Sequence, residues 1–191
     1  METTGAVVSG GASLPACEAL VVGPGLGRDQ DGLVRRLWEA FPGPMVVDAD
    51  AIRALPPRPA PSRYPRLLTP HAGEAAHLLG VGWRELEADR LSAARRLSEI
   101  APCVYKGAHP IVAVAGEPLR IFEGALPQLG IGGSGDVLAG LCGALAARAC
   151  PADDAGMGGV AAQAVSRQLV AARGAALGGG LTAILERLAL T

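Results

Sequence analysis

A glycine-rich segment that ends in a carboxylate is the part of this sequence most suited to chemistry. Residues 130–141 read Gly-Ile-Gly-Gly-Ser-Gly-Asp-Val-Leu-Ala-Gly-Leu. The apolar, proline-free run 137–149 predicts a buried helix that begins near Asp136. A glycine-rich turn before a helix directs several backbone N–H groups at one point, where the helix dipole also favours an anion. We therefore interpret this turn as an anion hole suited to phosphate.

Asp136 falls in the first turn of the predicted helix, beside the phosphate site. A carboxylate there could accept a proton from a substrate hydroxyl during phosphoryl transfer. The alternative is that Asp136 only caps the helix, which is a common role for acidic residues in a first turn. Two other glycine motifs are excluded. No Gly-Lys-Ser/Thr follows, as a P-loop requires, and Asp136 stands where a nucleophile elbow needs its last glycine.

The strongest compositional signal is a single lysine, Lys106, in a chain with sixteen arginines. It follows an apolar stretch that predicts a strand over 102–107. A lone lysine in this background marks a place where a compact ammonium suits the site better than a planar guanidinium. Chance survival of one lysine in a chain that has drifted to arginine explains it equally well.

Length and composition limit the partners. With 191 residues, half of them hydrophobic, the chain is expected to form one domain over 1–191, with 1–18 as a loosely ordered lead-in. A net charge of −1 and 3% aromatic residues argue against nucleic acid. No apolar stretch is long enough to predict a membrane span, and no basic region precedes an apolar run at the N-terminus.

The four cysteines, at 17, 103, 142 and 150, show no Cys-x-x-Cys and no metal-finger spacing. We interpret them as reduced, mostly buried thiols. This interpretation favours a cytoplasmic protein, since disulfides are rare in that compartment.

The elements that must position these residues alternate along the chain. Strands are predicted at 19–22, 45–47, 66–68 and 102–107, and helices at 29–41, 48–55, 69–79 and 83–100. This alternation is typical of parallel strands joined by crossover helices. A proline-rich loop at 56–65, an antiparallel hairpin of 110–115 with 119–122, and closing helices at 153–174 and 181–190 complete the prediction.

Two further groups could serve a ligand at the strand ends. The segment 23–27, Gly-Pro-Gly-Leu-Gly, is no dinucleotide fingerprint because Arg28 replaces its third glycine, but it still permits close backbone approach. His71 and Glu74 lie three residues apart at a helix start, close enough to share one site. The alternative is that Glu74 stabilises the first turn and His71 is an ordinary exposed residue.

Five motifs occur in one order over about Ala19 to Ala149. They are Gly-Pro-Gly-Leu-Gly (23–27), Asp-Ala-Asp-Ala (48–51), Thr-Pro-His-Ala-Gly-Glu (69–74), Lys-Gly-Ala-His (106–109) and Gly-Gly-Ser-Gly-Asp-Val-Leu-Ala-Gly (132–140). The set resembles the ADP/ATP-dependent NAD(P)H-hydrate dehydratase family. The resemblance implies a ribokinase-like α/β fold: a three-layer α/β/α sandwich with a mostly parallel sheet and a small antiparallel hairpin.

The resemblance also implies a metabolite-repair lyase. It would phosphorylate the ring hydroxyl of hydrated NADH or NADPH (NADHX or NADPHX) and eliminate phosphate to restore NAD(P)H. The co-substrate would be ADP or ATP, and the cofactor Mg²⁺. The family further implies a cytoplasmic homo-oligomer such as a tetramer.

Roles for individual residues are carried over by position. Asp136 would be the catalytic base and would also touch the substrate. The anion hole would be formed by Gly133, Ser134 and Gly135. Nucleotide binding would fall to Lys106, Gly107, Ala108, His109, Pro110 and Gly135. Gly25, Gly27 and His71 would contact the hydrated cofactor, and Glu74 would hold Mg²⁺ through phosphate. We expect Gly25, His71, Lys106 and Asp136 to converge on one cleft.

The sequence departs from the family pattern in several places. Nothing before Ala19 corresponds to the family's opening strands and helices, Pro110 and Ile131 stand where the family has Thr, and Ala125-Leu126 replaces Gly-Asn. Two alternatives therefore stay open. One is a ribokinase-like small-molecule kinase with the same anion hole and base. The other is an N-terminally shortened relative that binds nucleotide without turnover.

Overall fold

A single six-stranded sheet organises the chain. The computed structural model describes residues 17–124, 126–175 and 180–189. The strands follow one another in sequence order, β1 (Leu20–Val22), β2 (Met45–Val47), β3 (Arg66–Leu68), β4 (Cys103–Tyr105), β5 (Ile111–Ala113) and β6 (Arg120–Ile121). The first four are parallel, and β5 and β6 form the antiparallel hairpin. The predicted sheet is confirmed.

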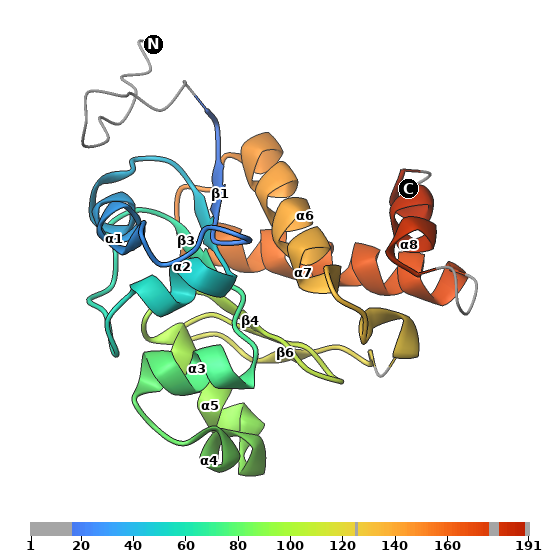
Figure 1. Cartoon of the computed structure of the whole chain (residues 1–191), viewed down its shortest axis with the longest axis horizontal. Helices are drawn as coiled ribbons and strands as arrows, with labels where there is room; N and C mark the ends of the chain where they lie inside the picture. The colour runs from blue at the N-terminus through green and yellow to red at the C-terminus, as the bar shows by residue number, and fades with distance from the viewer. Residues whose placement is uncertain (1–16, 125, 176–179, 190–191) are drawn as a thin grey trace.

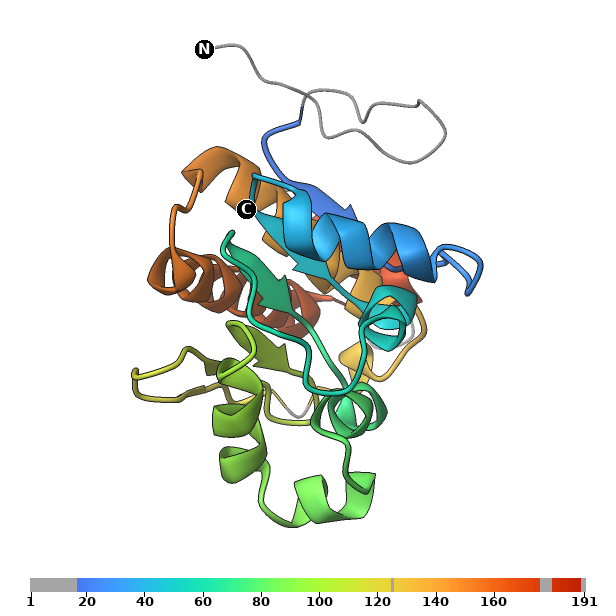
Figure 2. The same cartoon turned by 90° about the vertical axis from the view of Figure 1, so that its left-hand side faces the viewer.

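Helices cover both faces of the sheet (Figures 1 and 2). One layer contains α1 (Asp31–Ala40), α2 (Ala49–Ala54), α3 (Ala72–Leu79), α4 (Trp83–Ala88) and α5 (Arg90–Ser98). The other contains α6 (Ser134–Ala149) and α7 (Asp154–Gly174), with α8 (Gly180–Leu188) packed on α7 and a short 3-10 turn, η1 (Pro127–Leu129), before α6.

Strand residues alternate between the two layers because successive side chains point to opposite faces. Met45 and Val47 pack in the core on the α1–α5 side, whereas Val46 packs under α6 and α7. All three are fully buried. The expected three-layer α/β/α sandwich is thus confirmed, and it explains why this strand is a continuous apolar run.

The segment 83–100 departs from the predicted single helix, which was wrong. It forms α4 and α5, separated at Asp89, whose backbone has φ −140° and ψ 79°. The Asp89 carboxylate accepts a hydrogen bond from the Ser92 N–H at 2.9 Å. Because an aspartate side chain can satisfy the open N–H groups of a new helix, it ends one helix and starts the next within one amphipathic pattern.

The expectation of mostly buried thiols was wrong for half of them. Cys103 and Cys142 are buried, and burial raises the pKa of each thiol to about 12. Cys17 and Cys150 are exposed, and all four are free. Most of the expected lead-in, residues 1–16, lies outside the described residues. None of the described helices is long and apolar enough to cross a membrane.

Two glycines let the α6–α7 layer approach the sheet closely. A Cβ atom at Gly143 of α6 would collide with the Val21 side chain of β1. One at Gly158 of α7 would collide with the Val114 side chain just after β5. The height of both helices above the sheet is therefore set by the absence of side chains at these two positions.

Arg66, the first residue of β3, is a buried cation that no carboxylate contacts within the described residues. Its guanidinium donates to the carbonyl oxygens of Leu37, Trp38 and Phe41 at 3.1, 2.9 and 2.7 Å. These oxygens lie at the end of α1, where a helix leaves carbonyls without partners. Burial lowers the pKa of Arg66 to about 10, so it stays protonated at neutral pH. Arg66 thus fastens α1 to the sheet.

Replacing Arg66 with Met should strongly destabilise the fold. The variant keeps much of the side-chain volume but leaves several buried carbonyls without a donor. We expect the free energy of unfolding to fall by about 3–5 kcal/mol, as for loss of a buried hydrogen-bond network. Urea unfolding followed by circular dichroism measures it. Arg63→Met, at an exposed site nearby, is the matched control and should stay within about 0.5 kcal/mol of the parent. Equal stability of both variants would contradict this role of Arg66.

Candidate active site

The loops after the four parallel strands meet at one edge of the sheet, because the carboxyl ends of parallel strands face the same side. Hydrogen bonds join these loops directly. The Gly27 N–H donates to the Asp50 carboxylate at 3.0 Å, which links the loop after β1 to the start of α2. The Lys106 N–H donates to the Pro70 carbonyl at 2.8 Å, which links the loops after β4 and β3. The candidate site lies along this edge.

An ion cluster of Lys106, Asp48 and Glu74 occupies the centre of the edge. The Lys106 Nζ atom lies 2.7 Å from Asp48 Oδ1 and 3.7 Å from Glu74 Oε2. Asp48 is 1% exposed and Glu74 is 3% exposed, whereas the Lys106 side chain is 20% exposed. Burying a carboxylate costs free energy unless it is paired with a cation. Lys106, the only lysine of the chain, therefore stabilises the two buried carboxylates while part of its side chain stays exposed.

Asp48 is the residue that sequence reasoning missed. Its motif was recognised, but no role was given to its first carboxylate. Asp48 follows directly after the buried strand β2, and a carboxylate at the carboxyl end of a parallel strand could have indicated a site residue. Its partner lies 58 residues away, and only the fold brings the two together.

The predicted anion-hole turn leads into α6 and adjoins the ion cluster. Gly133 precedes the helix with φ +86°, a backbone conformation that favours glycine. A Cβ atom at Gly135 would lie 3.4 Å from Lys106 Nζ and 3.9 Å from Asp48 Oδ2. The helix begins at Ser134, slightly before the expected start, so Asp136 is its third residue. The start of α6 and the Lys106 ammonium are therefore close neighbours.

Two side-chain hydrogen bonds hold this turn. The Ser134 hydroxyl donates to the Leu129 carbonyl at 2.8 Å, and the Gln168 amide donates to the Ser134 carbonyl at 2.6 Å. The Ser134 N–H points at the Ile131 carbonyl at 3.3 Å. Within the described part of the chain, the N–H groups of Gly133, Gly135 and Asp136 have no acceptor. They are the donors left open to an anion.

Asp136 itself is exposed, and its carboxylate makes no hydrogen bond or ion pair with any residue that the structure describes. A capping carboxylate would accept an N–H of its own first turn. The geometry thus leaves Asp136 free to meet a ligand in front of the turn.

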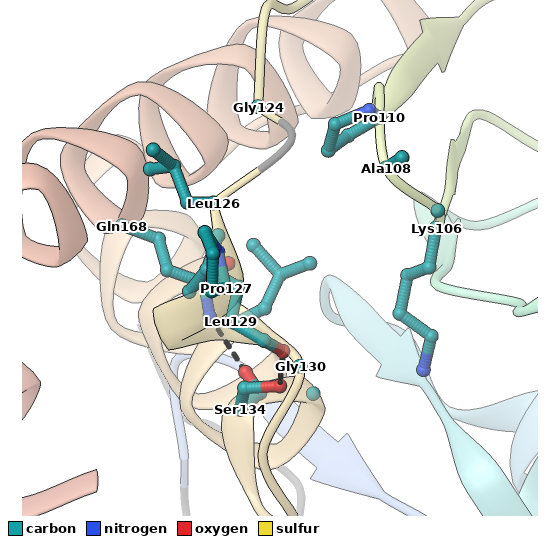
Figure 3. Close-up of a pocket in the computed structure, with 13 residues that line it drawn as sticks. Lys106, Ala108, Pro110, Gly124, Leu126, Pro127, Leu129, Gly130, Ser134 and Gln168 are labelled. Carbon is teal, nitrogen blue, oxygen red and sulfur yellow. Dashed lines mark hydrogen bonds between the residues drawn. The ribbon is translucent and has the colours of Figure 1, made fainter. Parts of the chain in front are cut away.

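A cavity of about 570 Å³ extends from the turn (Figure 3). Lys106, Ser134 and Gly135 lie at its polar end. Ala108, Pro110 and Leu126 line its apolar part. This division suits a ligand with an anionic group and a flat apolar body, and the volume is typical of small-molecule sites.

The structure brings some expected residues to this cavity and leaves others outside its lining. Five of the residues expected to bind nucleotide line it: Lys106, Gly107, Ala108, Pro110 and Gly135. His109 does not. Gly25, Gly27, His71 and Asp136 also lie outside the lining. A side chain at Gly25 or Gly27 would meet open space, so this part of the edge is accessible.

Glu74 caps the first turn of α3, which was one of its two expected roles, and His71 joins it in the cap, which the sequence did not predict. The His71 Nδ1 atom accepts the Gly73 N–H at 2.9 Å, and the Glu74 carboxylate accepts the His71 N–H at 2.9 Å. The His71 side chain is 49% exposed. Because Glu74 also lies in the ion cluster, the cap couples the start of α3 to Lys106.

The described residues contain no group of three or more His, Cys, Asp or Glu side chains that could hold a metal ion. The carboxylates of Asp48 and Glu74 are hard oxygen donors of the kind that Mg²⁺ prefers. They could supply one or two ligands, with phosphate and water as the others.

Comparison with known proteins adds the family. The sequence model of the NAD(P)H-hydrate dehydratase family matches residues 5–188. The chain is 39% identical over 164 residues to the bifunctional NAD(P)H-hydrate repair enzyme Nnr of Escherichia coli K12, covering 84% of this chain and 32% of that protein. It is 37% identical over 168 residues to the ADP-dependent (S)-NAD(P)H-hydrate dehydratase of Xanthomonas campestris, covering 85% and 57%. The chain thus spans between about a third and three fifths of these relatives.

Solved structures share the fold. The ADP/ATP-dependent NAD(P)H-hydrate dehydratase of Bacillus subtilis, co-crystallized with ATP/Mg²⁺, matches 91% of this chain and 63% of its own with a TM-score of 0.73 and 22% identity. The ADP complex of B. subtilis pyridoxal kinase matches 85% of this chain and 66% of its own, with a TM-score of 0.62 and 17% identity. The fold alone is thus common to dehydratases and kinases. The sequence match distinguishes them, and by it this chain belongs to the NAD(P)H-hydrate dehydratase family.

Proposed function

We propose that the chain catalyses the ADP-dependent dehydration of hydrated NADH and NADPH back to NAD(P)H. The single observation that carries the proposal is the first turn of α6. It combines open N–H groups and an unengaged Asp136 carboxylate with the nearby Lys106 ammonium, and Lys106 and Gly135 line a nucleotide-sized cavity. Family membership supplies the substrate class.

In this proposal the adenine base lies in the apolar part of the cavity, between the segment 106–110 and Leu126. The phosphates reach the turn before α6, where Lys106 and the N–H groups bind them. Asp48 and Glu74 would hold Mg²⁺ together with the nucleotide phosphates, and the ion would supply further neutralisation of the phosphate charge.

Asp136 takes the proton of the ring hydroxyl, and the hydroxyl oxygen attacks the terminal phosphorus of the nucleotide. The bond to the leaving nucleotide breaks, and the open N–H groups stabilise the charge on the transferring phosphoryl group. The ring nitrogen then donates its electron pair, the carbon–oxygen bond breaks, and inorganic phosphate leaves. A proton lost from the neighbouring ring carbon completes NADH or NADPH.

The substrate side of the proposal rests on accessibility. Gly25 and Gly27 offer bare backbone at the carboxyl edge of the sheet, and the half-exposed ring of His71 lies at the same edge, in the loop after β3. We propose that these three residues contact the hydrated cofactor. Bare backbone permits the close approach that a large dinucleotide requires.

We also propose a cytoplasmic location and a homo-oligomer such as a tetramer. The four free thiols support a cytoplasmic location, because a reducing compartment keeps cysteines unpaired. A homo-oligomer such as a tetramer rests on the family resemblance alone. The kinase alternative differs in its products, since a kinase retains the phosphoryl group on its substrate whereas the dehydratase releases it as inorganic phosphate.

Asp136→Asn tests the base. The amide is isosteric and the anion hole is backbone, so fold and ADP affinity should persist. Turnover should fall by ~10²–10⁴-fold, as expected for the loss of a general base. The assay follows the return of nicotinamide absorbance from hydrated NADH with ADP and Mg²⁺. Asp31→Asn, in the first turn of α1, is the matched control for the helix dipole and should leave turnover unchanged.

Equal rates for Asp136→Asn and the parent would remove the base assignment. A parent that binds ADP but releases no phosphate would instead favour the relative without turnover.

Lys106→Met tests the phosphate end of the cavity. ADP affinity, measured by calorimetry, should weaken by about 10- to 100-fold, the equivalent of one charged hydrogen bond. Adenosine, which lacks phosphate, should bind as before. Because the substitution also leaves the buried Asp48 carboxylate unpaired, the matched variant combines Lys106→Met with Asp48→Asn and should regain stability but not ADP affinity. Unchanged ADP binding in both would contradict the assignment.

A further inference from the structure

Gln168 on α7 is a buried polar side chain to which the sequence gives no role. It is 7% exposed and borders the cavity, on the wall opposite Lys106 (Figure 3). Its Nε2 atom donates to the Ser134 carbonyl at 2.6 Å, across 34 residues of chain. A carbonyl oxygen can only accept, so the nitrogen end of the glutamine must face Ser134. The orientation of the amide is thereby fixed.

The bonded carbonyl belongs to a peptide unit that matters for the anion hole. The Ser134 carbonyl and the Gly135 N–H are parts of one planar trans peptide, in which the C=O and N–H bonds point in opposite directions. Fixing the carbonyl toward Gln168 therefore fixes the N–H away from it. A Cβ atom at Gly135 would lie 3.4 Å from Lys106 Nζ, so this peptide adjoins the proposed phosphate position.

A tether is needed because the surrounding backbone is permissive. Three of the four residues 132–135 are glycine, and glycine tolerates many peptide orientations. The Leu138 N–H also donates to the Ser134 carbonyl in the first turn of α6, where helix ends fray, so the Gln168 amide is a second donor that holds this peptide. The Ser134 hydroxyl on the Leu129 carbonyl restrains only a side chain. A hydrogen bond to the carbonyl also polarises the peptide, which strengthens its N–H as a donor.

We propose that Gln168 is a positioning residue for phosphoryl transfer: it orients the Ser134–Gly135 peptide so that the Gly135 N–H points at the transferring group. This inference rests on the proposed function. Gln168 contacts neither the reacting atoms nor the phosphate, and it acts through the peptide that does.

Gln168→Met is the test variant, because methionine keeps the length and removes the donor. ADP affinity should fall by about 3- to 10-fold, the effect of one net hydrogen bond, while adenosine affinity stays the same. The kcat for hydrated NADH should fall further than ADP affinity, because charge on the phosphoryl oxygens is greatest in the transition state. Gln163→Met, at an exposed site on the same helix, is the matched control and should change none of these values.

A readout without ligand separates this inference from the proposed function. In Gln168→Met the Gly135 amide resonance should shift. The Leu138 amide, whose helical acceptor is the same Ser134 carbonyl, should exchange faster with solvent. If the parent does not bind ADP but the amide changes occur, the proposed function fails and the tether stands. An unchanged Gly135 amide, or an equal loss of ADP and adenosine affinity, overturns the inference.

Discussion

One ammonium between two buried carboxylates is the interaction on which the site depends. Asp48 ends β2, Glu74 lies in the first turn of α3 and Lys106 follows β4, so the ion cluster draws three loops to one point. Removing the lysine would leave charge buried without a partner, which costs more than the pair gains. The cluster also explains why lysine stands here. The Nζ atom already approaches the Gly135 position closely, and a guanidinium would need more room.

The two edges of the sheet carry cations of different kinds, Arg66 at the amino ends of the strands and Lys106 at the carboxyl ends. At the amino edge the Arg66 guanidinium donates hydrogen bonds to backbone carbonyl oxygens, which do not titrate, and the side chain is buried. At the carboxyl edge Lys106 keeps one open face toward the cavity. Arg66 therefore serves stability alone, whereas Lys106 combines a structural ion pair with an open face toward the cavity.

Local signals were enough for much of this structure. The strands β2 and β3 and the glycine-rich start of α6 are specified by residues next to one another, through apolar runs and backbone freedom. Roles that depend on non-local contacts could not be predicted from the sequence. Asp48 and Gln168 acquire their roles from partners far along the chain, which no sequence pattern displays. The break at Asp89 was missed for another reason, because a side-chain cap overrode an uninterrupted amphipathic period.

Gly143, where α6 packs on the sheet, controls the position of the anion hole although it is not a residue of the site. Gly143 lies eight residues, about 12 Å of helix, from Gly135, and its missing side chain sets how deeply α6 settles against Val21. The helix behaves as a rigid rod, so an added methyl group at that position would lift the rod and carry the anion hole away from Lys106. The distance between the anion hole and Lys106 therefore depends on the absence of a side chain at Gly143, two helical turns away from the site.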